Sequence, residues 1–169
     1  PADQPIVARP AADHIAAAES NAVAFYNSAL GARTNKYGAY LDVACAITGL
    51  APFAGLHTDE GRKASLHFSC AGLPEKWRRG DIFFHLLGHH IGQLAGRRVP
   101  VISGLPKETT LDNLKALCAA GAASGGIELL HAVGVTPEAP SLAAISIARE
   151  ELAVTRQDIK AAQRELSTA

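Results

Sequence analysis

The chain has 169 residues, of which 48% are hydrophobic and 5% aromatic, and its 16 basic side chains balance its 16 acidic ones. A net charge of zero, without a basic stripe, argues against a nucleic-acid or anionic-membrane partner, and the short apolar runs argue against a membrane span. The composition therefore predicts one globular unit of ordinary size.

The chain contains no Met and opens on Pro1, and its three cysteines cannot all pair with one another. These features predict an internal segment of a larger protein. They also predict a reducing, cytoplasmic setting.

Residues 1–62 are predicted to be helices joined by polar loops. Apolar residues recur at helical spacing over residues 14–30, with Asp13 as the N-cap and Gly31 as the stop. A second, shorter helix is expected over residues 40–48, where Gly49 ends it.

Residues 63–169 change to an alternation of β-like and helical runs, which predicts a largely parallel sheet covered by helices. Thr110 and Thr155 are the expected N-caps of two of these helices. Strands are expected over residues 64–70, 99–103, 127–135 and 152–154, and helices over residues 80–96, 110–124, 141–149 and 156–167. Three glycines spaced four apart are expected to pack one helix closely on the sheet or on a neighbouring domain: Gly88, Gly92 and Gly96.

The loop after the first helix carries a candidate anion site. Arg33, Thr34 and Asn35 place a guanidinium fork beside a hydroxyl and an amide, which suits a carboxylate ligand. A loop of this composition also suits a simple cap and turn, so the residues alone leave both interpretations open.

Two further polar runs are candidates for chemistry. Residues 57–62 combine His57, two carboxylates (Asp59 and Glu60) and a guanidinium, which suits acid–base work or a solvated, self-paired loop. Ser20 and Asn21 make one turn of an Ala-rich helix polar. That turn therefore faces either bulk solvent or a water-filled pocket.

Residues 131–140 run from the end of a predicted strand into a Pro-bounded turn that contains Thr136. Open α/β sheets bind ligands at such strand ends, so this segment is the strongest candidate by position. Cys45, Cys70 and Cys118 lack the short spacing of zinc or iron–sulfur sites and are expected to be small core residues on that basis.

Five runs in chain order resemble the large subunit of aconitase X enzymes. They are residues 18–23, residues 27–35, the run Ala46-Ile47-Thr48-Gly49 with Pro52, the run Gly55-Leu56-His57 with Asp59-Glu60, and residues 131–140. The resemblance spans nearly the whole chain, although that subunit is much longer than 169 residues.

The resemblance implies an aconitase-like α/β fold and a hydro-lyase that dehydrates a small hydroxylated carboxylic acid. Known activities of the family are cis-3-hydroxy-L-proline dehydratase and mevalonate 5-phosphate dehydratase. We expect the first substrate because no phosphate cradle is evident. The resemblance also implies an iron–sulfur cluster. Cys45 is either one ligand of this cluster or a core residue.

The resemblance implies roles for the candidate residues. Arg33, Thr34 and Asn35 would hold the substrate carboxylate, with further substrate contacts from Ser20, Asn21 and Thr136. His57 with Asp59 or Glu60 would lie near the chemistry. The chain lacks the family's Thr-Cys segment, the later part of the large subunit and the small swivelling domain, so we expect no activity from it alone. The alternative is a non-catalytic α/β scaffold or small-ligand binder.

Overall fold

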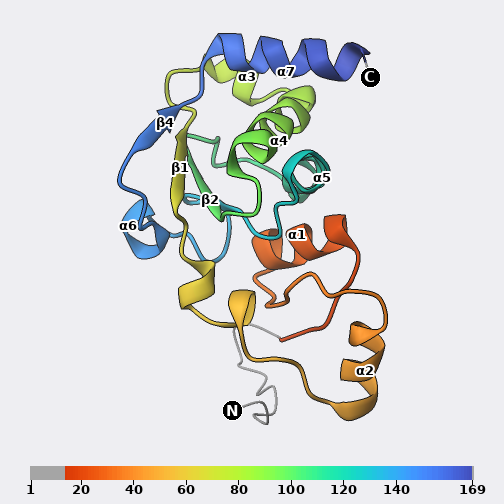
Figure 1. The fold of residues 1–169 in the computed structure, drawn as a ribbon. Helices are drawn as coiled ribbons and strands as arrows, with labels where there is room; N and C mark the ends of the chain where they lie inside the picture. Colours follow the sequence, from red (N-terminus) through yellow and green to blue (C-terminus); the bar gives the residue numbers. More distant parts are fainter. Residues whose placement is uncertain (1–13, 169) are drawn as a thin grey trace.

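The computed structural model describes residues 14–168, which form a four-stranded parallel sheet with helices (Figure 1). The strand order is β3-β2-β1-β4. The strands are β1 (Leu66–Ser69), β2 (Pro100–Ser103), β3 (His131–Ala132) and β4 (Glu151–Ala153). In the register of the sheet, His67 of β1 lies between Val101 of β2 and Glu151 of β4.

Helices α4 (Asp81–Ala95) and α5 (Leu111–Gly125) connect β1 to β2 and β2 to β3. Both crossovers step in the same direction along the sheet, so right-handed connections place both helices on one face. The remaining helices are α1 (Ser20–Ala29) against α5, α7 (Arg156–Thr168) against α4, and the separate α2 (Leu41–Thr48), with short helices α3 (Glu75–Arg78) and α6 (Leu142–Ile145).

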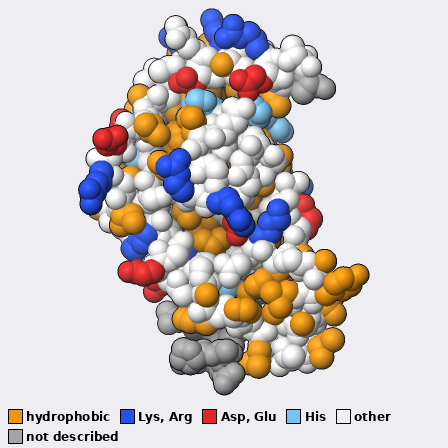
Figure 2. Space-filling model, viewed as in Figure 1, with side chains coloured by type: hydrophobic (Ala, Val, Ile, Leu, Met, Phe, Trp, Pro, Cys, Tyr) orange, Lys and Arg blue, Asp and Glu red, His pale blue; other side chains and the backbone are white. Residues whose placement is uncertain are grey.

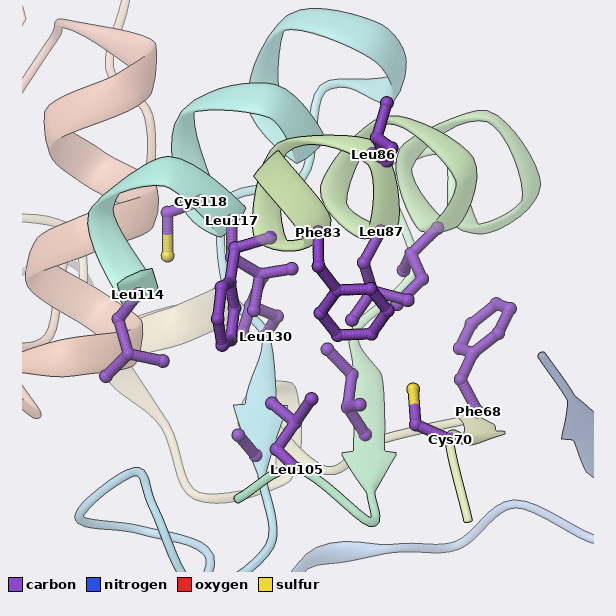
Figure 3. Packing of buried hydrophobic residues seen from close by; sticks show 14 of the residues in the cluster. Phe68, Cys70, Phe83, Leu86, Leu87, Leu105, Leu114, Leu117, Cys118 and Leu130 are labelled. Atoms are coloured by element: carbon purple, nitrogen blue, oxygen red, sulfur yellow. The ribbon is translucent and has the colours of Figure 1, made fainter. Parts of the chain in front are cut away.

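The main core lies between the sheet and α4 and α5 (Figure 3). Phe68 and Ile102 project from the strands toward Phe84, Leu87 and Leu117 of the helices, and each is at most 1% exposed. The mostly parallel α/β sheet predicted from the sequence is therefore confirmed.

Glycines bring α4 and α5 together. A Cβ atom at Gly92 would lie 2.0 Å from Ser124 Oγ, and one at Gly125 would lie 1.8 Å from Gly92 O. Gly88 and Gly92 thus allow the close backbone approach predicted from the sequence, but the neighbour is α5 and not the sheet or another domain, and Gly96 ends α4.

Several predicted ends are corrected by tertiary pairing. The first helix begins at Ser20, because residues 14–17 pair with residues 33–37; the Ile15 N–H donates to Arg33 O at 3.0 Å. The third strand shrinks to two residues because the chain turns at Gly134, whose φ is +71°. The helix expected over residues 141–149 ends at Ile145, where the chain bends and the Ile147 N–H donates to Ala64 O.

Candidate active site

A charged cluster lies where the loop after α1, the 3₁₀ turns Gly55–His57 and Glu60–Arg62, and the loop after β3 meet. We call it the polar cluster. Its members are Arg33, His57, Asp59, Arg62 and Glu138. Three of them, Arg33, His57 and Asp59, are site residues predicted from the sequence.

Arg62 is the centre of the polar cluster. It is 1% exposed, and its Nε donates to both carboxylate oxygens of Glu138 at 3.0 and 2.7 Å. Its Nη1 donates to Asn27 Oδ1 and Leu56 O, and its Nη2 donates to Asn27 O. Burial lowers the pKa of Arg62, and the Glu138 carboxylate opposes that change. The ion pair therefore ties the loop after β3 to α1 and to the 3₁₀ turns.

Arg33 faces the same carboxylates from the other side. Its Nη2 lies 2.6 Å from Asp59 Oδ1 and 3.6 Å from Glu138 Oε1, and its Nη1 donates to His57 O at 3.2 Å. Its Nε is buried with no hydrogen-bond partner among the described residues. The two guanidinium charges of the cluster are thus balanced by two carboxylates, and one strong donor is left over.

His57 is 1% exposed and sits between two aromatic partners. Its Nε2 lies 2.6 Å from Tyr37 Oη, and its Nδ1 lies 2.9 Å from His14 Nδ1, with the two imidazole rings stacked. Burial, followed by the charges of His14, Arg62 and Arg33, lowers the pKa of His57 to about 4. A neutral imidazole has one N–H, so if Tyr37 donates to Nε2, then His57 Nδ1–H donates to His14.

The buried imidazole makes stability depend on pH. The pKa of His57 is about 4 when folded and 6.5 when unfolded, so the unfolded chain binds more protons between these values. We expect the free energy of unfolding to fall by up to about 3 kcal/mol as the pH drops from 6.5 to 4. Urea denaturation across this range measures the slope, and His57→Gln should flatten it. An unchanged slope in this variant would assign the effect to His131 or His90, whose pKa is also lowered by burial.

Thr34, Asn35 and Thr136 hold the loops that carry the cluster. The Thr34 hydroxyl donates to Asn35 O and accepts from the Ala17 N–H. The Asn35 side chain donates to Ala54 O and accepts from the Leu56 N–H, and Thr136 Oγ1 accepts from the Ala132 N–H. Their polar atoms therefore brace the positions of Arg33, His57 and Glu138.

Ser20, Asn21 and Glu60 lie outside these contacts. The first two start α1, where the Glu19 carboxylate accepts from the Asn21 and Ala22 N–H groups. Glu60 is exposed, and over residues 14–168 no ion pair or side-chain hydrogen bond links any of these three to the polar cluster.

Sequence reasoning missed Glu138, Tyr37 and His14 as members or neighbours of the cluster. Glu138 was detectable as the only acidic side chain in residues 131–140, the segment favoured by its position after a strand. Tyr37 and His14 carry no such signal, because they reach His57 only through the pairing of residues 14–17 with residues 33–37.

The three cysteines are free and buried, and they lie in two environments. Cys70 and Cys118 belong to the main core (Figure 3), where burial raises the pKa of each thiol to about 12. Cys45 of α2 packs instead with Ala51 and with Tyr37, the hydrogen-bond partner of His57.

An iron–sulfur cluster needs several cysteine thiolates or equivalent ligands. In the part of the chain that the structure describes, no three His, Cys, Asp or Glu side chains are grouped to hold a metal ion. Of the three cysteines, Cys45 alone packs with Tyr37, whose hydroxyl contacts His57. The described residues therefore do not form a complete cluster site.

None of the helices in residues 14–168 is long and apolar enough to cross a lipid bilayer.

Comparison with known proteins accounts for both parts of the chain. Residues 7–60 match the aconitase X first domain, and residues 65–164 match the aconitase X second domain. The crystal structure of Thermococcus kodakaraensis aconitase X (holo-form) superposes with a TM-score of 0.81 at 40% identity, covering 91% of this chain and 38% of that one.

Curated relatives have two activities in their names. The chain is 44% identical to cis-3-hydroxy-L-proline dehydratase of Hypocrea jecorina and 43% identical to that of Pseudomonas aeruginosa, over 87% and 94% of its length. It is 39% identical to the phosphomevalonate dehydratase large subunit of Methanocaldococcus jannaschii, over 92% of its length. It spans 25%, 28% and 39% of these relatives. The two domain matches and the shared fold show that the chain belongs to the aconitase X family.

Proposed function

We propose that the complete protein carrying this chain is a dehydratase, a hydro-lyase that removes water from cis-3-hydroxy-L-proline. Two relatives at 43–44% identity bear the name of this activity. Phosphomevalonate dehydratase, the name of other relatives at 39–42% identity, is the second candidate.

The balanced charge of the polar cluster carries the choice of substrate. A hydroxyproline is a zwitterion, whose carboxylate suits Arg33 and whose ammonium suits Asp59 or Glu138. A phosphate ester brings close to two negative charges at neutral pH and needs unpaired cations. Both guanidinium groups already face carboxylates, so the cluster favours the zwitterion.

We propose that Arg33 is the anchor for the substrate carboxylate. Its unpaired Nε and the exposed position of Asp59, whose side chain is 68% exposed, support this role. The substrate carboxylate would take the place of Asp59 on the Arg33 fork. Thr34, Asn35 and Thr136 would position the loops, whereas contacts from Ser20 and Asn21 and a role for Glu60 stay predictions.

Dehydration removes a proton from carbon and a hydroxide from the neighbouring carbon. His57 is too buried to reach a substrate itself, so we propose that it acts as a positioning residue for Tyr37 and His14. With the Tyr37 hydroxyl donating to His57 Nε2 and His57 Nδ1–H donating to His14 Nδ1, His14 Nε2 would be the atom that accepts the substrate proton. This arrangement needs a neutral His57, in keeping with its lowered pKa.

The proposal includes an iron–sulfur cluster with Cys45 as one thiolate ligand, the other ligands coming from outside the described residues. Such a cluster would supply a Lewis acid for the departing hydroxyl. The remainder of the large subunit and the small swivelling domain would be the partners that complete the site. The three free thiols support the cytoplasmic location proposed from the sequence.

Replacing Cys45 with serine tests the ligand assignment. We expect the complete enzyme with Cys45→Ser, purified without oxygen, to lose most of its iron and sulfide, because serine is a poor substitute for a thiolate ligand. Cys118→Ala removes a core thiol and should keep the full content. Equal iron and sulfide in the wild type and Cys45→Ser would make Cys45 a packing residue.

Turnover by the complete enzyme tests the proposed function directly. We expect kcat/KM for cis-3-hydroxy-L-proline to exceed that for mevalonate 5-phosphate by at least about 100-fold. The 169-residue chain alone should turn over neither compound, because half a site leaves the reacting groups open to water. A reversed preference would favour the second candidate, and no turnover of either compound would favour the scaffold alternative.

A further inference from the structure

Helix α2 and the loop after it expose an unusual amount of apolar surface. Six of the thirteen exposed large hydrophobic side chains in residues 14–168 fall within residues 40–53. We call them the α2 surface, and they are Tyr40, Leu41, Val43, Ile47, Leu50 and Phe53. Figure 2 shows the hydrophobic side chains gathered at the end of the molecule where α2 lies. Soluble proteins rarely leave such a patch uncovered.

Helix α2 is weakly attached to the rest of the described chain. Cys45 is its only buried residue, whereas Tyr40 is 82% and Ile47 80% exposed. Beside Cys45 the surface is hollowed by about 450 Å³, with Leu50 and Phe53 in the lining. A helix that buries one side chain and borders an apolar hollow resembles one side of a protein–protein interface.

The α2 surface continues to the polar cluster. Cys45 packs with Tyr37, whose hydroxyl lies 2.6 Å from His57 Nε2. On the other side, the Phe53 ring lies 5.9 Å from the ring of His14. Whatever covers the α2 surface therefore also covers the edge of the candidate site next to His14.

The composition of residues 40–54 indicates what kind of segment would cover the α2 surface. Over residues 40–54 the only charged side chain is Asp42, so an apolar segment with at most a basic or hydrogen-bonding group opposite Asp42 fits best. The solved relative carries 62% of its chain outside the part that this chain covers. A second copy of the chain would bury the same surface, and the experiment below distinguishes it from such a segment.

We propose that the α2 surface binds an apolar segment from the part of the aconitase X protein that lies outside this chain, and that this segment forms the wall of the site beside His14. The role as a wall rests on the proposed function, since dehydration is favoured where water is excluded. The docking itself does not depend on the reaction.

Site-specific photo-crosslinking in the complete enzyme tests the docking. A p-benzoylphenylalanine replaces Ile47 in one variant and Tyr40 in a second, and Ile82 of α4, which is 66% exposed, is the matched control. We expect residues 47 and 40 to crosslink to peptides of the enzyme outside this chain, in yields well above residue 82. Their high exposure allows the replacements without disturbing the core.

Mass spectrometry of the crosslinked peptides separates the outcomes. Crosslinks confined to this chain, within one copy or between residues 40–53 of two copies, would overturn the proposal. Yields no higher than at residue 82 would also overturn it, because the surface would then be open to solvent. The readout involves no substrate, so failure of the proposed activity would leave this result unaffected.

Discussion

Replacing Arg62 with methionine is expected to lower the free energy of unfolding by about 3–5 kcal/mol, the cost of breaking one side of a buried ion pair. The change leaves Glu138 without the two hydrogen bonds from Arg62 Nε. It also leaves Asn27 O and Leu56 O without their donors in a buried setting. Methionine fills the volume of the arginine stem, so the decrease in the free energy of unfolding measures the lost polar contacts and not the cost of a cavity.

Urea denaturation at pH 7 measures this effect, and two further variants interpret it. Arg79→Met removes an exposed guanidinium that pairs with Glu75 on the surface, and we expect no measurable change. The double variant Arg62→Met with Glu138→Leu replaces both charges by apolar groups and should regain part of the loss. A change as small for Arg62→Met as for Arg79→Met would show that Arg62 is solvated and not a structural centre.

Replacing Arg33 with alanine is expected to lower kcat/KM of the complete enzyme about 100-fold, which corresponds to losing one charged hydrogen-bonded contact to a carboxylate. Its stability cost should be smaller, about 1 kcal/mol, because His57 O loses one donor while Glu138 keeps Arg62. Arg33→Lys restores the charge without the planar fork and should recover only part of the rate.

Steady-state kinetics and urea denaturation of the same preparations separate the two roles of Arg33. Arg97→Ala is the matched control, since that side chain is 83% exposed and pairs with Glu128 at the surface. It should leave both quantities unchanged. If Arg33→Ala reduced activity only in proportion to the folded fraction, Arg33 would be structural and the proposed carboxylate site would be withdrawn.

Local signals in the sequence were sufficient for most of the sheet and its helices. Thr110 caps α5 through Asn113, and Thr155 exchanges hydrogen bonds with Asp158 at the start of α7. Gly49 ends α2 with a φ of +69°. Caps and glycine stops act within four residues, so a single chain displays them without reference to its fold.

Where local and long-range preferences compete, the tertiary structure decided. Residues 14–19 have helical apolar spacing, yet the chain there pairs with residues 33–37, and α1 begins only at Ser20. Residues 127–130 have strand-like composition, but they do not join the sheet. Leu130 is buried, and its N–H donates to Ser28 Oγ and not to a neighbouring strand. Periodicity shows which side chains become buried without showing which partner buries them.

For the candidate site, the sequence by itself determined the polar runs that carry Arg33, His57 and Asp59, together with the family resemblance that joins them. Only the tertiary structure decided that Glu138 pairs with Arg62, 76 residues away, and that His57 is buried between Tyr37 and His14. Such pairings form because the folded sheet brings together loops that are far apart in the sequence. That placement is set by the packing of the whole core, not by any local run of residues.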